Sequence, residues 1–258
     1  MQTTIAVSAG AQKVINEFQE LHFYEKKVLC PYFMNIRKQR GGLRVLVGKG
    51  DPGEIVREVI VWAKVKHFDL QKANPDQIRI FMINQNIGID CSGFITHVIN
   101  YWLHEQGDKP LIKSLVFKNN DPISRLKRLL RPVENIGANL ITAEDNCEKI
   151  EQVKDIAPGD LIRLKGRLKN SHHVMLVFSV TKENELVKEF QLVESTKDYG
   201  KGNGIRFSKV IITDQNLGLK EQTWTDIDPE TQRNWTYENL LKEYEDNGIR
   251  RLKRVKLK

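Results

Sequence analysis

The spacing of apolar residues changes along the chain, and this change most constrains the fold. Up to Gly107, apolar residues recur at helical intervals of three and four. After about residue 155, four runs rich in Val, Ile, Leu and Phe follow one another between polar or Gly-containing segments. These runs are Leu161–Leu164, Val174–Val180, Leu186–Val193 and Ile205–Ile212. Helices followed by strands predict an α+β fold, and an antiparallel meander is the simplest arrangement of these strands.

Five segments have the pattern of helices. Asp51-Pro52-Gly53-Glu54 and Asn74-Pro75-Asp76-Gln77 each combine a capping residue, a Pro at the first helical position and an acid or amide at the third. Each therefore predicts the start of a helix. A third helix should begin near Cys91 and end at Gly107. The other expected helices are Ile15–Val28 and Tyr237–Asp246, the latter ending at Gly248 before a basic tail.

The positive charge of the chain is concentrated in three segments. The formal net charge is +8, and six cations lie between Arg250 and Lys258 without an acid among them. Two further basic runs are Arg37–Lys49 and Arg125–Arg131. These runs are either solvated faces or a basic surface for an anionic polymer such as nucleic acid.

Several classes of protein are disfavoured. No run approaches the roughly 18 apolar residues of a membrane span, so we expect no membrane crossing. The stretch Thr4–Ala11 lacks the layout of a secretory signal, which predicts a cytoplasmic protein or release by lysis or another non-classical route. Cys30, Cys91 and Cys147 are widely separated and odd in number, which favours a reducing compartment. We expect neither a metal nor a cofactor.

Cys91 is the candidate nucleophile. It lies in Gly88-Ile89-Asp90-Cys91-Ser92-Gly93-Phe94, where Asp90 or Ser92 can cap the following helix. A helix N-terminus stabilises thiolate over thiol, and its backbone N–H groups can receive the charge of an attacked carbonyl oxygen. The alternative is that Cys91 is a small buried apolar residue.

A thiolate nucleophile needs a base, and His172-His173 leads into a strand. Alternation along the strand lets only one of them share a face with Met175. A turn at Glu183-Asn184 would place His173 directly opposite Glu194, whereas a three-residue loop would pair His172 with Glu194. A carboxylate beside an imidazole fixes its tautomer and favours the imidazolium.

Four segments together carry a family resemblance. In order and spacing they resemble the NlpC-type branch of the papain-like cysteine peptidases, over roughly residues 88–196. The segments are Asp90–Phe94, Ala157–Leu161, Ser171–Val174 and Val193–Ser195. The resemblance implies a papain-like fold, in which a helix bearing the Cys packs on an antiparallel sheet bearing the His. It also implies Cys91 as nucleophile, His173 as general base and then acid, and Glu194 as the group that orients the imidazole.

The chain differs from the family pattern at three places. The third catalytic position is usually His, Asn or Gln but is Glu194 here, and Met175 stands where Gly often follows His-Val. A Pro-Tyr pair usually lies shortly before the Cys motif, whereas Pro31-Tyr32 lies upstream of two expected helices. Tyr32 is either a hydrogen-bond donor of the site or a core tyrosine. Tyr32 and Ser92 are the candidates for contacts with the substrate or the oxyanion.

We therefore expect one elaborated domain spanning residues 1–258. It comprises a helical N-terminal extension or insertion (1–87), an NlpC-like catalytic core (88–196) and a C-terminal strand, helix and basic tail (197–258). The helices between Asp51 and Asn84 are candidates for a lid or a specificity wall.

The expected function is that of a cysteine hydrolase, an amidase or peptidase that cleaves an amide through an acyl-thioester. By the resemblance, the substrate would be a peptide of the bacterial cell wall, a muropeptide. The alternatives are acyl transfer at the same Cys–His site, or a non-catalytic basic module that binds nucleic acid or another polyanion.

Overall fold

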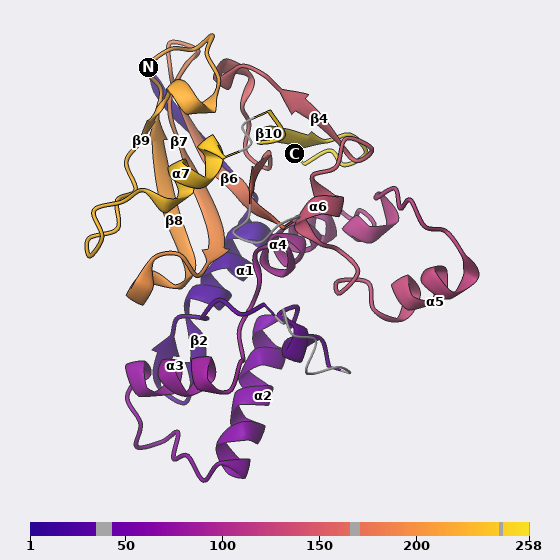
Figure 1. Ribbon diagram of the computed structural model, residues 1–258, viewed down its shortest axis with the longest axis vertical. Helices are drawn as coiled ribbons and strands as arrows, with labels where there is room; N and C mark the ends of the chain where they lie inside the picture. The colour runs from indigo at the N-terminus through magenta and orange to yellow at the C-terminus, as the bar shows by residue number, and fades with distance from the viewer. Residues whose placement is uncertain (35–42, 166–170, 243–244, 258) are drawn as a thin grey trace.

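An antiparallel sheet forms the centre of the structure, as the apolar runs predict. The computed structural model describes residues 1–34, 43–165, 171–242 and 245–257, and within them the sheet has eight strands (Figure 1). Its strands are β1 (Gln2–Ala6), β4 (Cys147–Ile150), β5 (Leu161–Lys165), β6 (His172–Glu183), β7 (Leu186–Thr196), β8 (Gly204–Ile211), β9 (Thr223–Trp224) and β10 (Gly248–Leu252). Strands β5 to β8 form the expected meander, and the α+β class is confirmed.

The edges of the sheet come from segments far apart in the sequence. The strand order is β4-β10-β5-β6-β7-β8-β9, and β1 pairs with the second half of β6, beyond the part that β5 covers. β6 is therefore the longest strand and the centre of the sheet.

Three of the expected helices begin where their capping signals predict, whereas the helix expected from Ile15 begins at Ala9 and the one expected over Tyr237–Asp246 spans Trp235–Leu241. The helices are α1 (Ala9–Gln19), α2 (Pro52–Val65), α3 (Pro75–Asn84), α4 (Cys91–Glu105), α5 (Pro122–Leu130), α6 (Ala138–Ile141) and α7 (Trp235–Leu241). Both predicted capping boxes are present, at Asp51 with Glu54 and at Asn74 with Gln77. α4 begins at Cys91, with Asp90 as its N-cap.

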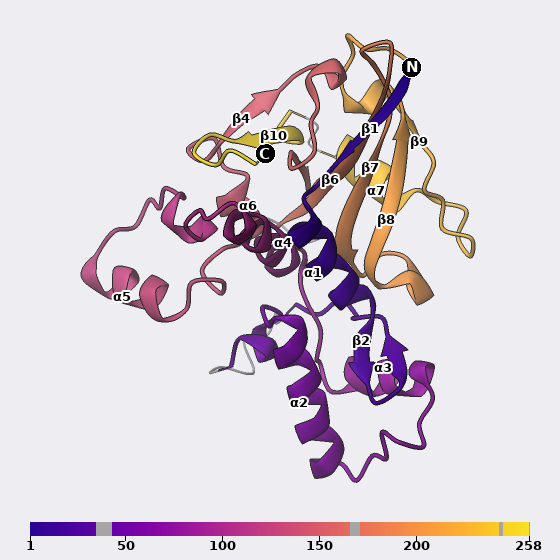
Figure 2. The same cartoon turned by 180° about the vertical axis from the view of Figure 1, so that it is seen from behind.

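Helices cover both faces of the sheet. Figures 1 and 2 show α7 on one face, and α1 and α4 on the other. The buried side chains of the sheet accordingly separate into two groups. Val174, Leu176 and Val193 pack in the core that includes α1 and α4, whereas Met175 and Leu192 pack in the core that includes Leu240 of α7. The alternation of buried residues along β6 and β7 thus serves two cores.

Three sequence-based expectations are wrong. The helix expected over Ile15–Val28 ends at Gln19, and a hairpin of β2 (Leu21–Phe23) and β3 (Lys26–Val28) follows it. The segment 1–87 is not only helical, because it supplies β1 to the central sheet. The third concerns Arg250–Lys258, which does not form a solvated tail, because its first residues form β10 between β4 and β5.

Two arginines of β10 show why this basic segment folds. Arg250 is buried, and Arg251 makes a two-pronged hydrogen bond to Asp160, with 2.8 Å between each nitrogen–oxygen pair. Asp160 also caps the turn at Ala157 by accepting from its backbone N–H. Charge pairing across the sheet therefore overrides the like-charge repulsion along the segment. Lys258 lies outside the described residues.

The turn between β6 and β7 also differs from the prediction. Asn184 and Glu185, both with positive φ, form the turn, so that Glu183 pairs with Leu186. Positive φ at both positions is typical of a two-residue hairpin turn. Farther from the turn, the pairing of β6 with β7 shifts by one residue between Lys182 and Thr181 and shifts back between Ser179 and Val177. Continuing the pairing of Leu176 with Val193 places Met175, not His173, opposite Glu194.

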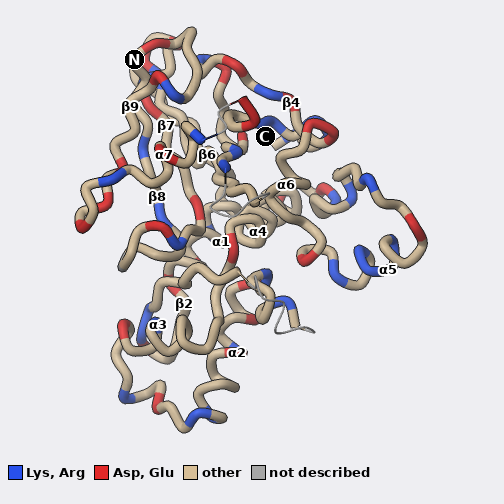
Figure 3. Tube along the Cα trace, viewed as in Figure 1, with Lys and Arg blue, Asp and Glu red and all other residues tan. Residues whose placement is uncertain are grey.

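Figure 3 shows the charges along the chain, including the cations of α5, which projects from the side of the molecule. Among the described residues, we find no helix that combines the length and the apolar character needed to cross a membrane.

The contact between α1 and α4 gives a stability prediction. Phe18 and Phe94 are fully buried, and their rings meet edge to face with centroids 5.5 Å apart. Phe94→Ala should lower the free energy of unfolding by about 3–5 kcal/mol, because it removes this contact and leaves a cavity. Urea denaturation measures the change. A loss below about 1 kcal/mol would contradict the packing, because substitutions at exposed positions lower the free energy of unfolding by no more than that.

Candidate active site

Cys91 lies at the first turn of α4 and faces a small cavity. The cavity has a volume of about 50 Å³, and Cys91 itself is 6% exposed. The residues that line the cavity are Tyr32, Met34, Cys91, Lys165, Ser171, His172, His173, Thr196, Lys197, Asp198 and Asn239. The thiol is thus neither open to bulk water nor sealed among apolar side chains.

His173 connects Cys91 to Glu194. The Cys91 side chain lies close enough to the His173 ring to raise its pKa, and Nε2 of that ring lies 2.5 Å from Oε2 of Glu194. Because each ring nitrogen makes one in-plane hydrogen bond, Nδ1 is left for the sulfur. The structure therefore brings the three predicted residues together, although His173 reaches Glu194 diagonally across the strands.

The two neighbouring histidines have opposite electrostatic environments. Burial acts to lower the pKa of His173, but the adjacent Cys91 and Glu194 outweigh it and raise this pKa well above its ordinary value. The pKa of His172 is lowered by burial and by Arg163, although its Nε2 lies 3.0 Å from Asp246. His173 thus favours the imidazolium and His172 the neutral ring.

Glu194 is held from its other side by α7. Glu194 is 1% exposed, and its Oε1 accepts a hydrogen bond from the Thr236 hydroxyl at 3.4 Å. That hydroxyl is also 2.8 Å from the Tyr199 hydroxyl. A buried carboxylate with a partner on each oxygen keeps one orientation. No sequence pattern points to Thr236, because a single Thr at a helix start is not distinctive.

A buried cation lies beneath the first turn of α4. Lys49 is 6% exposed, and its ammonium donates to Asp90 Oδ1 at 2.9 Å, to Ser92 Oγ at 2.6 Å and to the Ile136 carbonyl at 2.9 Å. All three N–H donors of Lys49 are therefore used. The same Oδ1 of Asp90 accepts from the Gly93 backbone N–H at 2.6 Å.

Sequence reasoning missed Lys49 by treating it as part of the basic run Arg37–Lys49. Residues 37–42 of that run lie outside the described residues, and Lys49 does not belong to a solvated face. Its flanking glycines, Gly48 and Gly50, are the signal that could have marked a close backbone approach.

Gly93 explains why the segment after Cys91 needs a small residue. A Cβ at Gly93 would lie 2.7 Å from the Gly48 carbonyl and 3.0 Å from Cδ of Lys49. Any side chain there would push Lys49 away from Asp90. The glycine of the Asp-Cys-Ser-Gly segment is therefore required by the buried ion pair.

Tyr32 reaches the site although two helices separate it from Cys91 in sequence. It forms a parallel bridge with Ile89, and Gly88 lets the chains approach, because a Cβ there would lie 2.2 Å from the Pro31 carbonyl. Burial, then the charges of Cys91 and Asp90, raise the pKa of Tyr32 well above its ordinary value. Tyr32 therefore keeps its hydroxyl proton and can donate it in a hydrogen bond.

Ser92 contributes to the site differently from the prediction. Its hydroxyl donates to Asp90 Oδ1 at 3.0 Å and accepts from Lys49, so this side chain belongs to the buried network beneath the helix. Its backbone N–H remains in the first turn of α4, where helical N–H groups lack helical partners.

The helices between Asp51 and Asn84, expected as a lid or a specificity wall, do not border the cavity with any described residue. Arg79 of α3 donates to the Asn203 carbonyl, and the Asn203 side chain accepts from the Tyr32 backbone N–H at 2.7 Å. The Gly200–Gly204 segment is therefore a turn that supports Tyr32.

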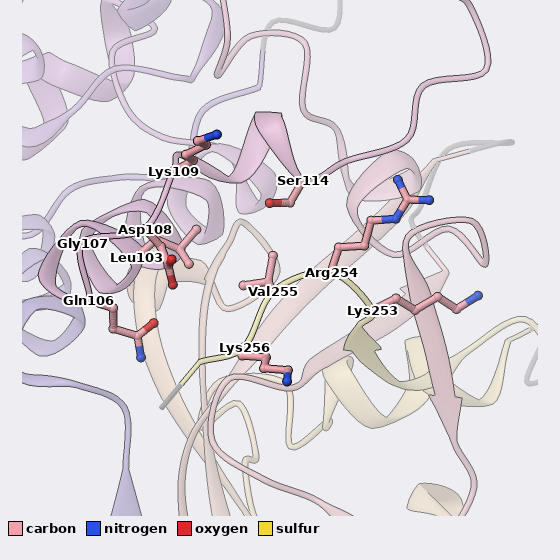
Figure 4. Close-up of a pocket in the computed structure, with 10 residues that line it drawn as sticks. All are labelled: Leu103, Gln106, Gly107, Asp108, Lys109, Ser114, Lys253, Arg254, Val255 and Lys256. Atoms are coloured by element: carbon pink, nitrogen blue, oxygen red, sulfur yellow. The ribbon is translucent and has the colours of Figure 1, made fainter.

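A larger cavity of about 840 Å³ lies at the other end of α4 (Figure 4). Lys109, Lys253, Arg254 and Lys256 border it, but the figure shows these side chains pointing in different directions. Charges that diverge do not form one anion site, and the cavity is remote from the Cys91 thiol at the helix start.

Comparisons with protein-family models, curated proteins and solved structures gave no match to this chain. Function is therefore inferred from the geometry of the site.

The buried ion pair gives a prediction about stability. Lys49→Met should lower the free energy of unfolding by about 3–5 kcal/mol, because it leaves the Asp90 carboxylate buried without its cation. Lys64→Met, at an exposed position near the end of α2, should change it by less than about 0.5 kcal/mol. Urea denaturation of both variants makes the comparison, and equal losses would contradict the role of Lys49.

Proposed function

We propose that the protein is a cysteine hydrolase of the NlpC type, with a papain-like arrangement of helix and sheet, that cleaves an amide bond. The observation that carries this proposal is the continuous chain from the Cys91 thiol through the His173 ring to the buried carboxylate of Glu194. A nucleophile, a base and a group that orients the base are the parts that acyl transfer to a thiol requires.

The first half of the reaction forms an acyl-thioester. The Cys91 proton moves to His173, and the thiolate attacks the amide carbon to give a tetrahedral intermediate. The backbone N–H of Cys91 and the Tyr32 hydroxyl are the donors for its oxyanion. The His173 imidazolium then gives its proton to the leaving nitrogen, the carbon–nitrogen bond breaks, and the amine departs.

The second half releases the acid. Water loses a proton to His173 and attacks the thioester carbon, after which the carbon–sulfur bond breaks. The proton on His173 returns to the sulfur, so that the carboxylic acid leaves and the Cys91 thiol is restored. Glu194 stabilises the imidazolium in both halves without taking its proton.

The cavity suggests the chemical class of the substrate. At about 50 Å³ it holds only the groups next to the scissile amide. Lys165, Lys197 and Asp198 line it, which suits a peptide with charged groups better than an apolar acyl chain. The resemblance to NlpC-type peptidases supports short peptides of the bacterial cell wall as the first substrates to test.

The first test is hydrolysis of purified muropeptides and a panel of simple amides, followed by mass spectrometry. Cys91→Ser should reduce cleavage at least about 10³-fold, because its hydroxyl is a poorer nucleophile in a site built for a thiolate. In ¹⁸O-labelled water, the new carboxylate should gain one labelled oxygen. Cys147→Ser is the matched control, because a hydroxyl there can keep the hydrogen bond to the Ile141 carbonyl. Cleavage that survives in Cys91→Ser would refute the proposal.

A second test does not depend on the substrate. Glu194→Gln removes the carboxylate that helps to raise the pKa of His173, so this pKa should fall. Fewer imidazolium–thiolate pairs then exist at pH 6, and alkylation of Cys91 by iodoacetamide should slow about tenfold, the equivalent of one pKa unit. Mass spectrometry of the labelled peptides measures the rate.

Cys30 and Cys147 serve as internal references in this alkylation test. Burial raises the pKa of Cys147 to about 12 and that of Cys30 further, so both should remain unlabelled at pH 6. Glu189→Gln, on the same strand but paired with Lys209, should leave the Cys91 rate unchanged. A wild-type rate in Glu194→Gln would show that Glu194 does not act on the pair.

A further inference from the structure

α5 has an exposed apolar face. All nine of its residues are described, and none is buried. Ile123, Leu126, Leu129 and Leu130 have exposed fractions between 55% and 70%. At 3.6 residues per turn these four side chains lie within an arc of about 120°. Four large aliphatic side chains on one face of one helix differ from the single exposed apolar residues that are normal on surfaces.

The opposite face of α5 is basic. Arg125, Lys127 and Arg128 occupy the remaining arc, and Arg125 and Lys127 lie at the two borders of the apolar face. Arg128 is held against the preceding loop by the Asn119 carbonyl and the Asn120 side chain. The cations therefore flank the apolar side chains on both sides.

The surrounding segment adds to this charge. From Lys109 to Arg131 the chain has seven cations and one acid, Asp121. The Asp121 carboxylate caps α5 by accepting from the Ser124 backbone N–H at 2.9 Å. Figures 1 and 3 show α5 projecting from the body with its cations along it.

We propose that α5 is a docking helix for a membrane surface rich in anionic lipids. An amphipathic helix with flanking Lys and Arg lies in the plane of such a surface, with its apolar side chains among the acyl chains and its cations at the headgroups. Ile123, Leu126 and Leu129 are the side chains that enter the apolar layer. Arg125 and Lys127 bind the lipid phosphates.

The chemistry of the apolar face favours lipid over nucleic acid. A single-stranded nucleic acid would be bound by cations together with aromatic side chains for stacking, and the face of α5 is aliphatic. Binding to phosphates alone would leave these four side chains in water. An anionic surface with an apolar interior satisfies both faces of the helix. This inference is independent of the activity proposed for Cys91.

The test is flotation of the full chain with vesicles. Vesicles of phosphatidylcholine with about one third phosphatidylglycerol should carry the protein upward in a density gradient, and vesicles of pure phosphatidylcholine should not. The triple variant Ile123→Ser, Leu126→Ser, Leu129→Ser should bind at least about tenfold more weakly. Removing both cations, in Arg125→Gln with Lys127→Gln, should weaken binding roughly fivefold for each charge.

Matched variants control for general losses of apolar character and charge. Val65→Ser, Ile80→Ser and Ile227→Ser together change three side chains that are 55–59% exposed elsewhere on the surface, and this triple variant should leave flotation unchanged. The double variant Lys64→Gln with Lys66→Gln should also leave flotation unchanged.

Four outcomes would overturn the proposal. The first is wild-type protein that stays at the bottom of the gradient, and the second is a triple serine variant that floats like wild type. The third is a protein that binds duplex DNA but not vesicles, and whose DNA binding is lost in the double glutamine variant and kept in the triple serine variant. The fourth is a dimer in size-exclusion chromatography that the serine substitutions dissociate, because α5 would then be an interface between two copies.

Discussion

The first turn of α4 depends on one buried ion pair, between Lys49 and Asp90. The ammonium and carboxylate satisfy each other within the core, and Asp90 also caps the helix that begins at Cys91. Removing either group would leave the other charge buried without compensation, which costs far more than the pair contributes to stability. The ion pair therefore acts mainly by fixing orientation. It sets where the helix starts, and so where the sulfur and the first backbone N–H groups lie.

The sheet supplies the other half of the site, in which His173 of β6 contacts Glu194 of β7 although the two residues are not directly opposite each other. His173 and Glu194 are diagonal neighbours, because the turn between β6 and β7 lies at Asn184 and Glu185 and the two irregularities in the pairing cancel before the site. Side chains on the same face of a sheet remain within reach across a diagonal when both are long. Thr236 then holds the second oxygen of Glu194, so that the carboxylate aligns with the imidazole. A Glu is long enough to span this diagonal to the ring.

Local signals predicted the parts of this structure that depend on local interactions. The Asp51 and Asn74 capping boxes and the start of α4 follow from hydrogen bonds within one turn. The β1 strand and the burial of Lys49 depend on partners far away in the sequence, which no local pattern encodes. For the same reason, no local pattern decides between a site role and a core role for Tyr32. Only the bridge to Ile89 places it beside Cys91.

The charges around the site are arranged in two layers with different consequences. Beneath the helix, Lys49 and Asp90 neutralise each other, so that the thiol above them experiences the helix N-terminus more than a net charge. Above it, the carboxylate of Glu194 faces His173 and, together with Cys91, raises the pKa of this histidine. If the lower pair were missing its cation, the uncompensated Asp90 carboxylate would oppose the negative charge that the proposed reaction places on the Cys91 sulfur. The Lys49–Asp90 ion pair and the Cys91–His173 pair therefore act at the same end of α4, and the proposed chemistry of the second pair depends on the neutrality of the first.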